Sequence, residues 1–165
     1  MAHLRRLAVC CTSTILAVLQ PRSIGPLHIG SRDPLQQATM DPRYLSHEAD
    51  AQMFIEGVRM SRKLAQMPAF QPLVLRATRP GADAQGDAAI LDYVQSSAQT
   101  AWHMCGTCKM GVDAAAVVGP RLKVRGIGGL RVVDSSIFPT IPSSNTNMPS
   151  IAVGEKGAEL IRASR

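Results

Sequence analysis

Aromatic side chains are scarce in this sequence, and its basic residues are not gathered into one patch. Phe, Tyr and Trp make up 4% of the 165 residues, although the net charge is +6. The densest basic stretch, Arg59–Lys63, lies in a predicted helix and is interrupted by Met60 and Ser61. Nucleic-acid-binding proteins place basic side chains along one face and interleave aromatic ones. The sequence therefore does not indicate a nucleic-acid partner.

Cysteine is also rare. The four cysteines form two close pairs, Cys10 with Cys11 and Cys105 with Cys108. A disulfide framework stabilises chains that are much shorter than this one, and it spaces its cysteines along the whole sequence. The cysteine pattern therefore does not indicate a disulfide-stabilised fold.

No hydrophobic run is long enough to cross a membrane. The longest, Leu7–Leu19, is shorter than a bilayer span. Arg5 and Arg6 precede it, as in a signal peptide, but no small-residue cleavage site lies before Gln20. We therefore expect residues 13–20, STILAVLQ, to form a buried strand. The sequence does not distinguish a cytoplasmic protein from a secreted one.

The composition and patterning are those of a globular chain. Hydrophobic residues make up 45% of the sequence, and it has neither internal repeats nor low-complexity segments. The clearest helical pattern begins after Ser46, a candidate N-cap, and ends before Pro68. Two further helices are predicted, from Ala88 to Ser97 with Asp87 as its cap, and from Ser150 to Arg162. Short strands are predicted at 27–29, 122–125 and 130–133, which gives a mixed α+β fold.

The most reactive side chains lie in residues 102–111, WHMCGTCKMG. A redox dithiol requires C-x-x-C at the start of a helix that follows a strand, whereas here a predicted helix comes before Cys105 and Gly-Val-Asp follows the motif. A zinc site that used His103, Cys105 and Cys108 would need a fourth ligand, and the sequence has no second C-x-x-C. In the simplest interpretation, both cysteines are small buried side chains and His103 is a core histidine.

A longer pattern changes this interpretation. WHMCGTCKMG, followed by VVGPRLKVRGIGGLRVVDSSIFPTIPSSNTNMPSIAVGEKGAELI, resembles the C-terminal signature of the glucose-methanol-choline (GMC) flavin oxidoreductases, in particular their choline- and alcohol-dehydrogenase-like branch. Residues 19–65 resemble the preceding part of the same family's substrate-binding region. The resemblance implies an α+β fold in which helices pack on an antiparallel sheet, with a C-terminal strand and helix that return to an FAD-binding domain. It divides the chain into an unmatched segment (1–14), a substrate-binding region (15–100) and a catalytic, FAD-contacting segment (101–165).

The resemblance also implies a chemistry and a partner. Enzymes of this family oxidise a small-molecule alcohol by passing hydride to N5 of FAD. The histidine of their H-x-x-G-T motif corresponds to His103, and its partner corresponds to Asn145. An imidazole can accept the hydroxyl proton near neutral pH, and an uncharged amide can donate to the developing alkoxide without competing for that proton. Taken without the resemblance, Asn145 would be a loop-stabilising side chain.

Further residues are implied to contact FAD. They are Trp102, Asp134, Thr146, Asn147 and Met148. The last three lie just before or at the start of the C-terminal helix, where free N–H groups favour negative charge, such as that of a reduced flavin. Trp102 would lie beside the flavin ring, and Asp134 near the ribityl or pyrophosphate chain. Without the resemblance, Asp134 would be a turn residue or a helix cap.

Three features depart from the family pattern. No G-x-G-x-x-G motif follows any predicted strand, so the dinucleotide-binding half of the enzyme is missing. Residues 1–11 match nothing in the family, and Gly119 stands where the family usually has Asp. We therefore expect the C-terminal part of a longer enzyme that is inactive by itself. The alternatives are an inactive relic that pairs with a full-length relative and, outside the family, a small metal-binding module.

Overall fold

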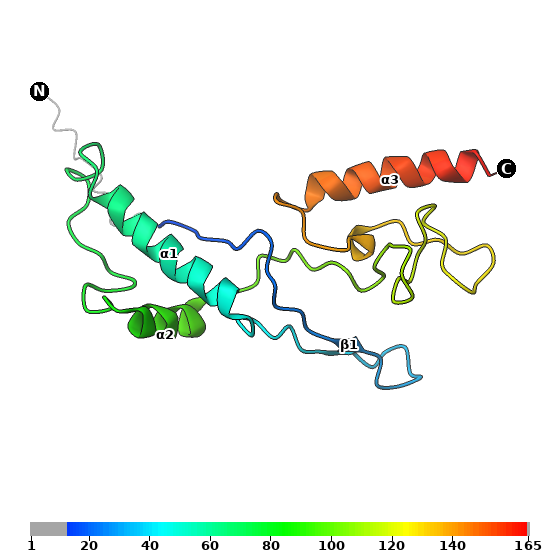
Figure 1. Ribbon diagram of the computed structural model, residues 1–165, viewed down its shortest axis with the longest axis horizontal. Coiled ribbons are helices and arrows are strands. Elements are labelled where there is room, and N and C mark those ends of the chain that lie inside the picture. The colour runs from blue at the N-terminus through cyan, green and yellow to red at the C-terminus, as the bar shows by residue number, and fades with distance from the viewer. Residues whose placement is uncertain (1–12, 165) are drawn as a thin grey trace, which may run out of the picture.

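The computed structural model describes residues 13–164, which form an elongated α+β arrangement with helices at both ends of its long axis (Figure 1). In chain order the elements are β1 (Leu27–His28), β2 (Thr39–Met40), α1 (Glu48–Ala65), α2 (Asp87–Ser97), the 3-10 helix η1 (Ser135–Ile137) and α3 (Asn147–Arg162). Strands β1 and β2 pair antiparallel, with Leu27 opposite Met40. Helices α1 and α2 lie at one end, and η1 and α3 at the other. The predicted fold class, helices packed with an antiparallel sheet, is confirmed.

Helix α1 forms where the sequence predicted its strongest helix, but its cap differs by one residue. His47, rather than Ser46, is the N-cap, and its Nδ1 accepts a hydrogen bond from Ala49 N at 3.2 Å. Acidic residues lie in the first turn and basic residues in the last, where each complements the helix dipole. The helix ends at Ala65, before Pro68, because proline would remove a backbone donor.

The apolar faces of α1 and α2 form the first hydrophobic cluster. It contains Ile55 and Val58 of α1 and Ile90 and Val94 of α2, all buried. Helix α2 thus buries the face that carries Ile90 and Val94. Its predicted cap is wrong: Gly86 is the N-cap and the helix begins at Asp87 itself.

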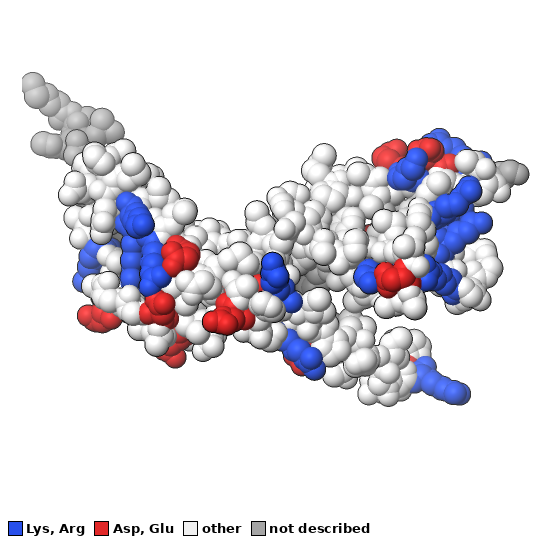
Figure 2. Space-filling view, viewed as in Figure 1, with Lys and Arg blue, Asp and Glu red and all other residues white. Residues whose placement is uncertain are grey.

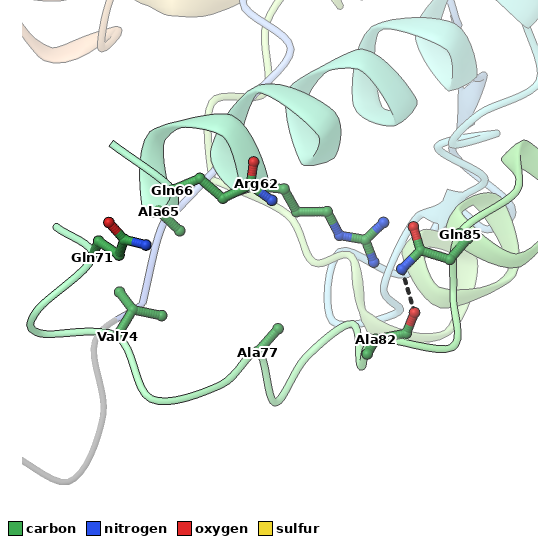
Figure 3. A pocket seen from close by; sticks show the side chains of 8 residues that line it. All are labelled: Arg62, Ala65, Gln66, Gln71, Val74, Ala77, Ala82 and Gln85. Atoms are coloured by element: carbon green, nitrogen blue, oxygen red, sulfur yellow. Dashed lines mark hydrogen bonds between the residues drawn. The ribbon is translucent and has the colours of Figure 1, made fainter. Parts of the chain in front are cut away.

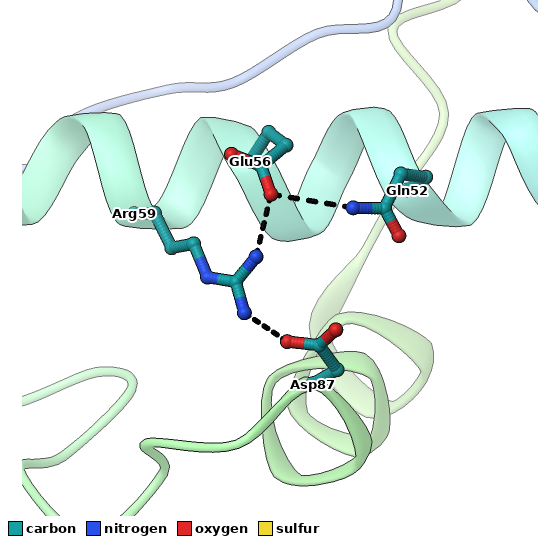
Figure 4. A network of polar contacts seen from close by, with 4 residues as sticks. All are labelled: Gln52, Glu56, Arg59 and Asp87. Carbon is teal, nitrogen blue, oxygen red and sulfur yellow. Dashed lines mark hydrogen bonds and ion pairs between the residues drawn. The ribbon is translucent and has the colours of Figure 1, made fainter.

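A polar network joins the same two helices at the surface (Figure 4). Arg59 of α1 pairs with Glu56 one turn earlier, at 2.5 Å between Nη1 and Oε1, and with Asp87 at the start of α2. Gln52 donates to the same Glu56 oxygen. Because these side chains are exposed and solvent screens their charges, the network adds little stability and serves mainly to orient α2 against α1.

The predicted strand at residues 13–20 is wrong. These residues form no regular structure, and Ile15 and Leu19 are exposed. No neighbouring segment pairs with this backbone in the described chain, so an apolar run alone does not make a strand here. Leu16 instead packs on the first cluster. The rest of the predicted apolar segment, and nearly all of the unmatched segment 1–14, lie outside the described residues.

Asp50 fixes the chain that follows this segment. Its carboxylate is 2% exposed and accepts hydrogen bonds from Arg22 N and Ser23 N, both at 2.8 Å, and from Ser23 Oγ at 2.5 Å. Burial alone would raise the pKa of the Asp50 carboxyl, but these bonds and the nearby His47 hold the pKa below its usual value. The N-terminal segment is therefore tied to the first turn of α1.

The other end of the molecule is built on a twisted two-stranded ribbon. Lys123 and Arg131 face each other across an isolated antiparallel bridge, and Gly126 and Gly129 have positive φ values of 77° and 76° in the turn between them. The predicted strands 122–125 and 130–133 therefore exist only as isolated bridges. Besides the Lys123–Arg131 pair, Val124 pairs antiparallel with Val118, which in turn pairs parallel with Met110. The turn itself lies where the sequence placed it.

A second hydrophobic cluster lies under this ribbon. Val118, Leu122 and Ile137 are buried in it, and Val133 and Val153 pack against it. Helix α3 approaches closely because Gly157 lacks a side chain: a Cβ there would lie 2.3 Å from Val133 Cγ1. At Gly154, three residues earlier, a Cβ would meet nothing within 4 Å.

Helix α3 begins three residues earlier than predicted, at Asn147 rather than Ser150. Pro149 lies inside the first turn, where its missing N–H costs no intrahelical bond. Among the described residues, no helix is both long and apolar enough to traverse a bilayer.

Candidate functional site

The segment that carries His103 is held beside η1 by backbone hydrogen bonds. Cys108 N donates to Ser136 O at 2.9 Å, and Met110 N donates to Ile137 O at 2.8 Å. Gly106 has φ +89°, a conformation that glycine adopts without strain. Its backbone lies so close to the η1 segment that a Cβ would be 3.4 Å from Phe138 O. Two segments about thirty residues apart in the sequence are thereby placed side by side.

This arrangement brings His103 to the start of α3. His103 is half-buried, and its Nδ1 lies 2.9 Å from Thr146 Oγ1, a hydrogen bond between side chains forty-three residues apart. Thr146 is 9% exposed. The interpretation of His103 as a buried core histidine therefore does not hold, because its side chain is only half-buried. One ring nitrogen is held, and the other is not bonded to any residue that the structure describes.

Asn145 directly precedes Thr146. Its Oδ1 accepts a hydrogen bond from Asn147 N at 2.9 Å, which stabilises the loop and the first turn of α3. The amide nitrogen donates to no acceptor in the described chain. Asn145 thus has the loop-stabilising contact, and its NH₂ group is still available as a donor. No direct hydrogen bond joins Asn145 and His103 in the structure.

The surroundings of these residues are uncharged. Between Asp92 and Lys109, and again between Asp134 and Glu155, the sequence contains no Asp, Glu, Lys or Arg. Figure 2 shows the same feature in space: the surface around the beginning of α3 is white, while charged side chains lie toward the ends and the lower edge. The two segments that meet at the His103–Thr146 contact therefore carry no charged side chain of their own.

Two large side chains next to the His103–Thr146 pair are open to solvent. Trp102 is 78% exposed and Met148 is 70% exposed. Trp102 also has φ +60°, a left-handed backbone conformation that is unfavourable for a bulky residue. Strained residues of this kind persist where the surrounding structure requires them, and they are common at functional sites.

The first turn of α3 presents one unused backbone donor. Asn147 N is capped by Asn145, and Pro149 has no N–H. Within residues 13–164, Met148 N donates to no acceptor. This N–H lies at the positive end of the helix dipole, where it favours an electron-rich atom.

Asp134 has a local structural contact. It is the N-cap of η1, and its Oδ1 accepts from Ser136 N at 2.8 Å. Its side chain is exposed. Asp134 is thus a helix cap in the structure. Its side chain makes no hydrogen bond with His103 or Thr146.

The C-x-x-C motif lacks the features of a redox or metal site. Cys105 and Cys108 are free thiols, and no helix begins at the motif. Burial raises the pKa of the Cys105 thiol, which lowers its thiolate fraction. Among the described residues, no group of three or more His, Cys, Asp or Glu side chains could hold a metal ion.

One hollow of about 340 Å³ lies at the other end of the molecule, beyond the end of α1 (Figure 3). Its lining is formed by Arg62, Ala65, Gln66, Gln71, Val74, Ala77, Ala82 and Gln85. Arg62 donates to Gly81 O at 3.2 Å and so fixes the loop that walls the hollow. The lining contains neither a nucleophile nor a general base, so the chemistry of the chain points to His103 instead.

Comparison with known proteins gives a consistent result. The sequence profile of the family described as GMC oxidoreductase matches residues 21–154. An oxygen-dependent choline dehydrogenase from Escherichia coli O45:K1 is 44% identical over 140 residues, which cover 85% of this chain and 25% of that enzyme.

Solved structures are similar over the same region. Pyridoxine 4-oxidase from Mesorbium loti superposes with a TM-score of 0.81 and 29% identity, over 86% of this chain and 28% of that one. Formate oxidase from Aspergillus oryzae RIB40, in a structure that concerns FAD modification, superposes with a TM-score of 0.80 and 33% identity, over 86% and 25%. The chain thus spans about a quarter of the length of these relatives.

Proposed function

The chain belongs to the GMC oxidoreductase family, and we propose that it supplies the proton-accepting side of the active site in an FAD-dependent alcohol oxidoreductase. The observation that carries this proposal is the position of His103. It is a half-buried imidazole, held through Nδ1 by Thr146, in a region without charged side chains.

His103 would act as the general base. An imidazole titrates near neutrality, so its free ring nitrogen can accept the proton of an alcohol at physiological pH. The NH₂ group of Asn145 would donate a hydrogen bond to the oxygen as negative charge develops on it. Because the Asn145 carbonyl already accepts from Asn147 N, the amide presents its donor rather than its acceptor to the site.

The exposed residues around His103 fit one side of a flavin site. Trp102 and Met148 offer apolar surface, and Met148 N offers a donor at a helix N-terminus. Asn147 and Thr146 would line the same edge, and Asp134 would contact the cofactor through the carboxylate oxygen that η1 does not use. When bound, FAD would supply the hydride acceptor.

A second polypeptide segment is needed to complete this site. The sequence contains no G-x-G-x-x-G motif, and four large apolar side chains near His103 are exposed, namely Trp102, Met104, Met148 and Ile151. We propose that they pack against a dinucleotide-binding domain. The same surface supports the second candidate, in which the chain pairs with a full-length relative and has no catalytic role.

Complementation tests the two candidates. The chain would be co-expressed with the E. coli choline dehydrogenase from which the matched 140-residue region has been removed. We expect a complex that retains FAD and reduces a dye when choline or benzyl alcohol is added. His103→Gln should lower kcat by about 10²–10⁴-fold, the usual contribution of a general base.

His28→Gln is the matched control, because His28 lies exposed on β1, in a different part of the chain from the site. It should leave kcat unchanged. A flavin-containing complex in which His103→Gln retains full activity would refute the base assignment. A complex with no turnover of any alcohol, in both wild type and variants, would support the non-catalytic candidate.

A further inference from the structure

Thr146 occupies a helix-capping position without capping the helix. It is the N-cap residue of α3, and threonine is among the preferred residues there because its hydroxyl can accept from a free N–H of the first turn. No such bond is present at Thr146. Its Oγ1 is directed instead to His103 Nδ1, at 2.9 Å. The backbone angles of Thr146 are helical (φ −72°, ψ −9°) rather than the extended ones of a capping residue, and its hydroxyl is thereby left to contact a side chain forty-three positions away.

Asn145 makes this arrangement possible. By accepting from Asn147 N, its Oδ1 caps the first turn of α3, so the helix does not need the Thr146 hydroxyl as a cap. The backbone carbonyl of Thr146 still begins the helix, because it accepts from both Ser150 N and Ser150 Oγ. The backbone of Thr146 is thus committed to α3, while its buried hydroxyl remains committed to the histidine.

Building on the proposed function, we propose that Thr146 is a positioning residue that fixes the tautomer of His103. In this arrangement His103 Nδ1–H donates to Thr146 Oγ1, and Nε2 carries the lone pair. The hydrogen bond of one ring nitrogen determines which nitrogen carries the proton. Neutral histidine in water favours the opposite tautomer, with hydrogen on Nε2, which cannot accept a proton at that atom.

The direction of this bond follows from the proton balance of the reaction. When Nε2 takes the hydroxyl proton of the alcohol, the ring becomes an imidazolium with N–H on both nitrogens. Nδ1 then still donates to Thr146, so the contact is kept before and after transfer. If the Thr146 hydroxyl were the donor, the ring could accept a proton only at Nδ1, and it would lose the contact in doing so.

Nitrogen NMR of the full chain tests this assignment without any flavin. The ring nitrogens of ¹⁵N-labelled protein would be recorded about two units above the reference imidazole pKa of ~6.5, and His103 would be identified by the loss of its signals in His103→Gln. We expect the wild type to show a protonated Nδ1 and an unprotonated Nε2. Thr146→Val, which keeps the shape and removes the hydroxyl, should shift His103 toward the Nε2–H tautomer.

Thr146→Ser restores the hydroxyl and should restore the wild-type pattern, which a purely structural role of the threonine methyl group would not do. Thr107→Val is the control, since Thr107 is an exposed threonine near His103 with no side-chain hydrogen bond in the structure. The proposal is overturned if wild-type His103 is already the Nε2–H tautomer, or if Thr146→Val leaves the tautomer unchanged in a chain whose α3 amide signals persist. If NMR shows the expected tautomer but the complex in the complementation experiment is inactive, the proposed function is refuted and the tautomer assignment stands.

Discussion

At the scale of single residues, Asp50 makes a buried contact that bears on stability. It is almost fully buried, and its carboxylate accepts three hydrogen bonds from residues 22 and 23. The Ser23 hydroxyl that donates to Asp50 also accepts from His47 N, the backbone of the α1 cap. One side chain thereby links an irregular segment to the beginning of a helix. No sequence pattern predicts this link, because an acidic residue in a first helical turn is normally solvated.

Replacing Asp50 should make the protein less stable and less sensitive to acid. Because the folded-state pKa of Asp50 is lowered, its contribution to stability is present above the unfolded pKa of ~3.9 and is lost as the pH falls through the lower folded value. Asp50→Asn should cost about 1–3 kcal/mol at neutral pH. It should also flatten the acid limb of the stability curve. Urea unfolding between neutral pH and about pH 3 measures both effects.

The control is Asp92→Asn, on the exposed face of α2, where no hydrogen bond is lost. It should change the free energy of unfolding by no more than about 0.5 kcal/mol. An Asp50→Asn protein with the wild-type acid limb would show that Asp50 does not cause the acid dependence.

The residues of the candidate site were predictable to different degrees. His103 and Asn145 could be found because their spacing follows a family pattern, and the structure does place their segments together. Thr146 was found only as part of that pattern. Its contact with His103 could not be read from the sequence, since a threonine at a helix start is expected to cap the helix. The only signal is the neighbouring Asn145, which supplies a second side chain able to cap.

At the scale of elements, helices and strands differ in how well the sequence predicts them. The α1 and α2 patterns are local: periodic apolar residues and an acidic first turn lie within each segment, and α1 also has a basic last turn. Strands require a partner. Residues 13–20 have the composition of a strand but no neighbour to pair with, while β2 (Thr39–Met40) was not predicted at all and forms because β1 lies beside it. Helix α3 begins before the predicted Ser150 because a first helical turn accepts Pro149.

Two glycines in α3 allow an internal comparison of packing. Gly157→Ala should destabilise the protein by about 1–3 kcal/mol, because the new Cβ would overlap Val133, a β-branched side chain with little freedom to move. Gly154→Ala should stabilise it by up to about 1 kcal/mol, because alanine favours the helix and its methyl group meets open space. Thermal unfolding monitored by circular dichroism gives both values.

The double variant Gly157→Ala/Val133→Ala checks the cause. If overlap with Val133 is responsible, the second substitution should recover part of the lost stability. Equal effects of alanine at positions 154 and 157 would contradict the close packing of α3 on the ribbon.

At the scale of the whole molecule, the chain presents one edge of a site rather than an enclosed one. Its candidate base, its helix N-terminus and its largest exposed aromatic side chain lie together, with apolar surface left uncovered around them. Contiguous exposed apolar surface of this kind is typical of an interaction site. The expectation that the site is incomplete rests on the sequence, which contains no G-x-G-x-x-G motif, and it stays a prediction.

The isolated chain should therefore not retain FAD. We expect protein that has been incubated with excess FAD and passed through a gel-filtration column to be colourless near 450 nm, and to show no alcohol-dependent dye reduction. The dinucleotide-binding motif that would hold the cofactor's phosphates is absent from the sequence. A yellow protein with stoichiometric flavin would show that the α3 edge alone binds the cofactor.

The two hydrophobic clusters have a consequence for cooperativity. One is formed by α1 and α2 and the other by the ribbon, η1 and α3, and the helices of one end make no element-level contact with those of the other in the described chain. We expect such a protein to melt as two units rather than in a single step. Because His103 and Thr146 both lie on the α3 side, any partner that covers them raises the melting temperature of that unit. The melting temperature of the α1–α2 unit would stay unchanged. A thermogram with two steps would then show which end of the chain the partner binds.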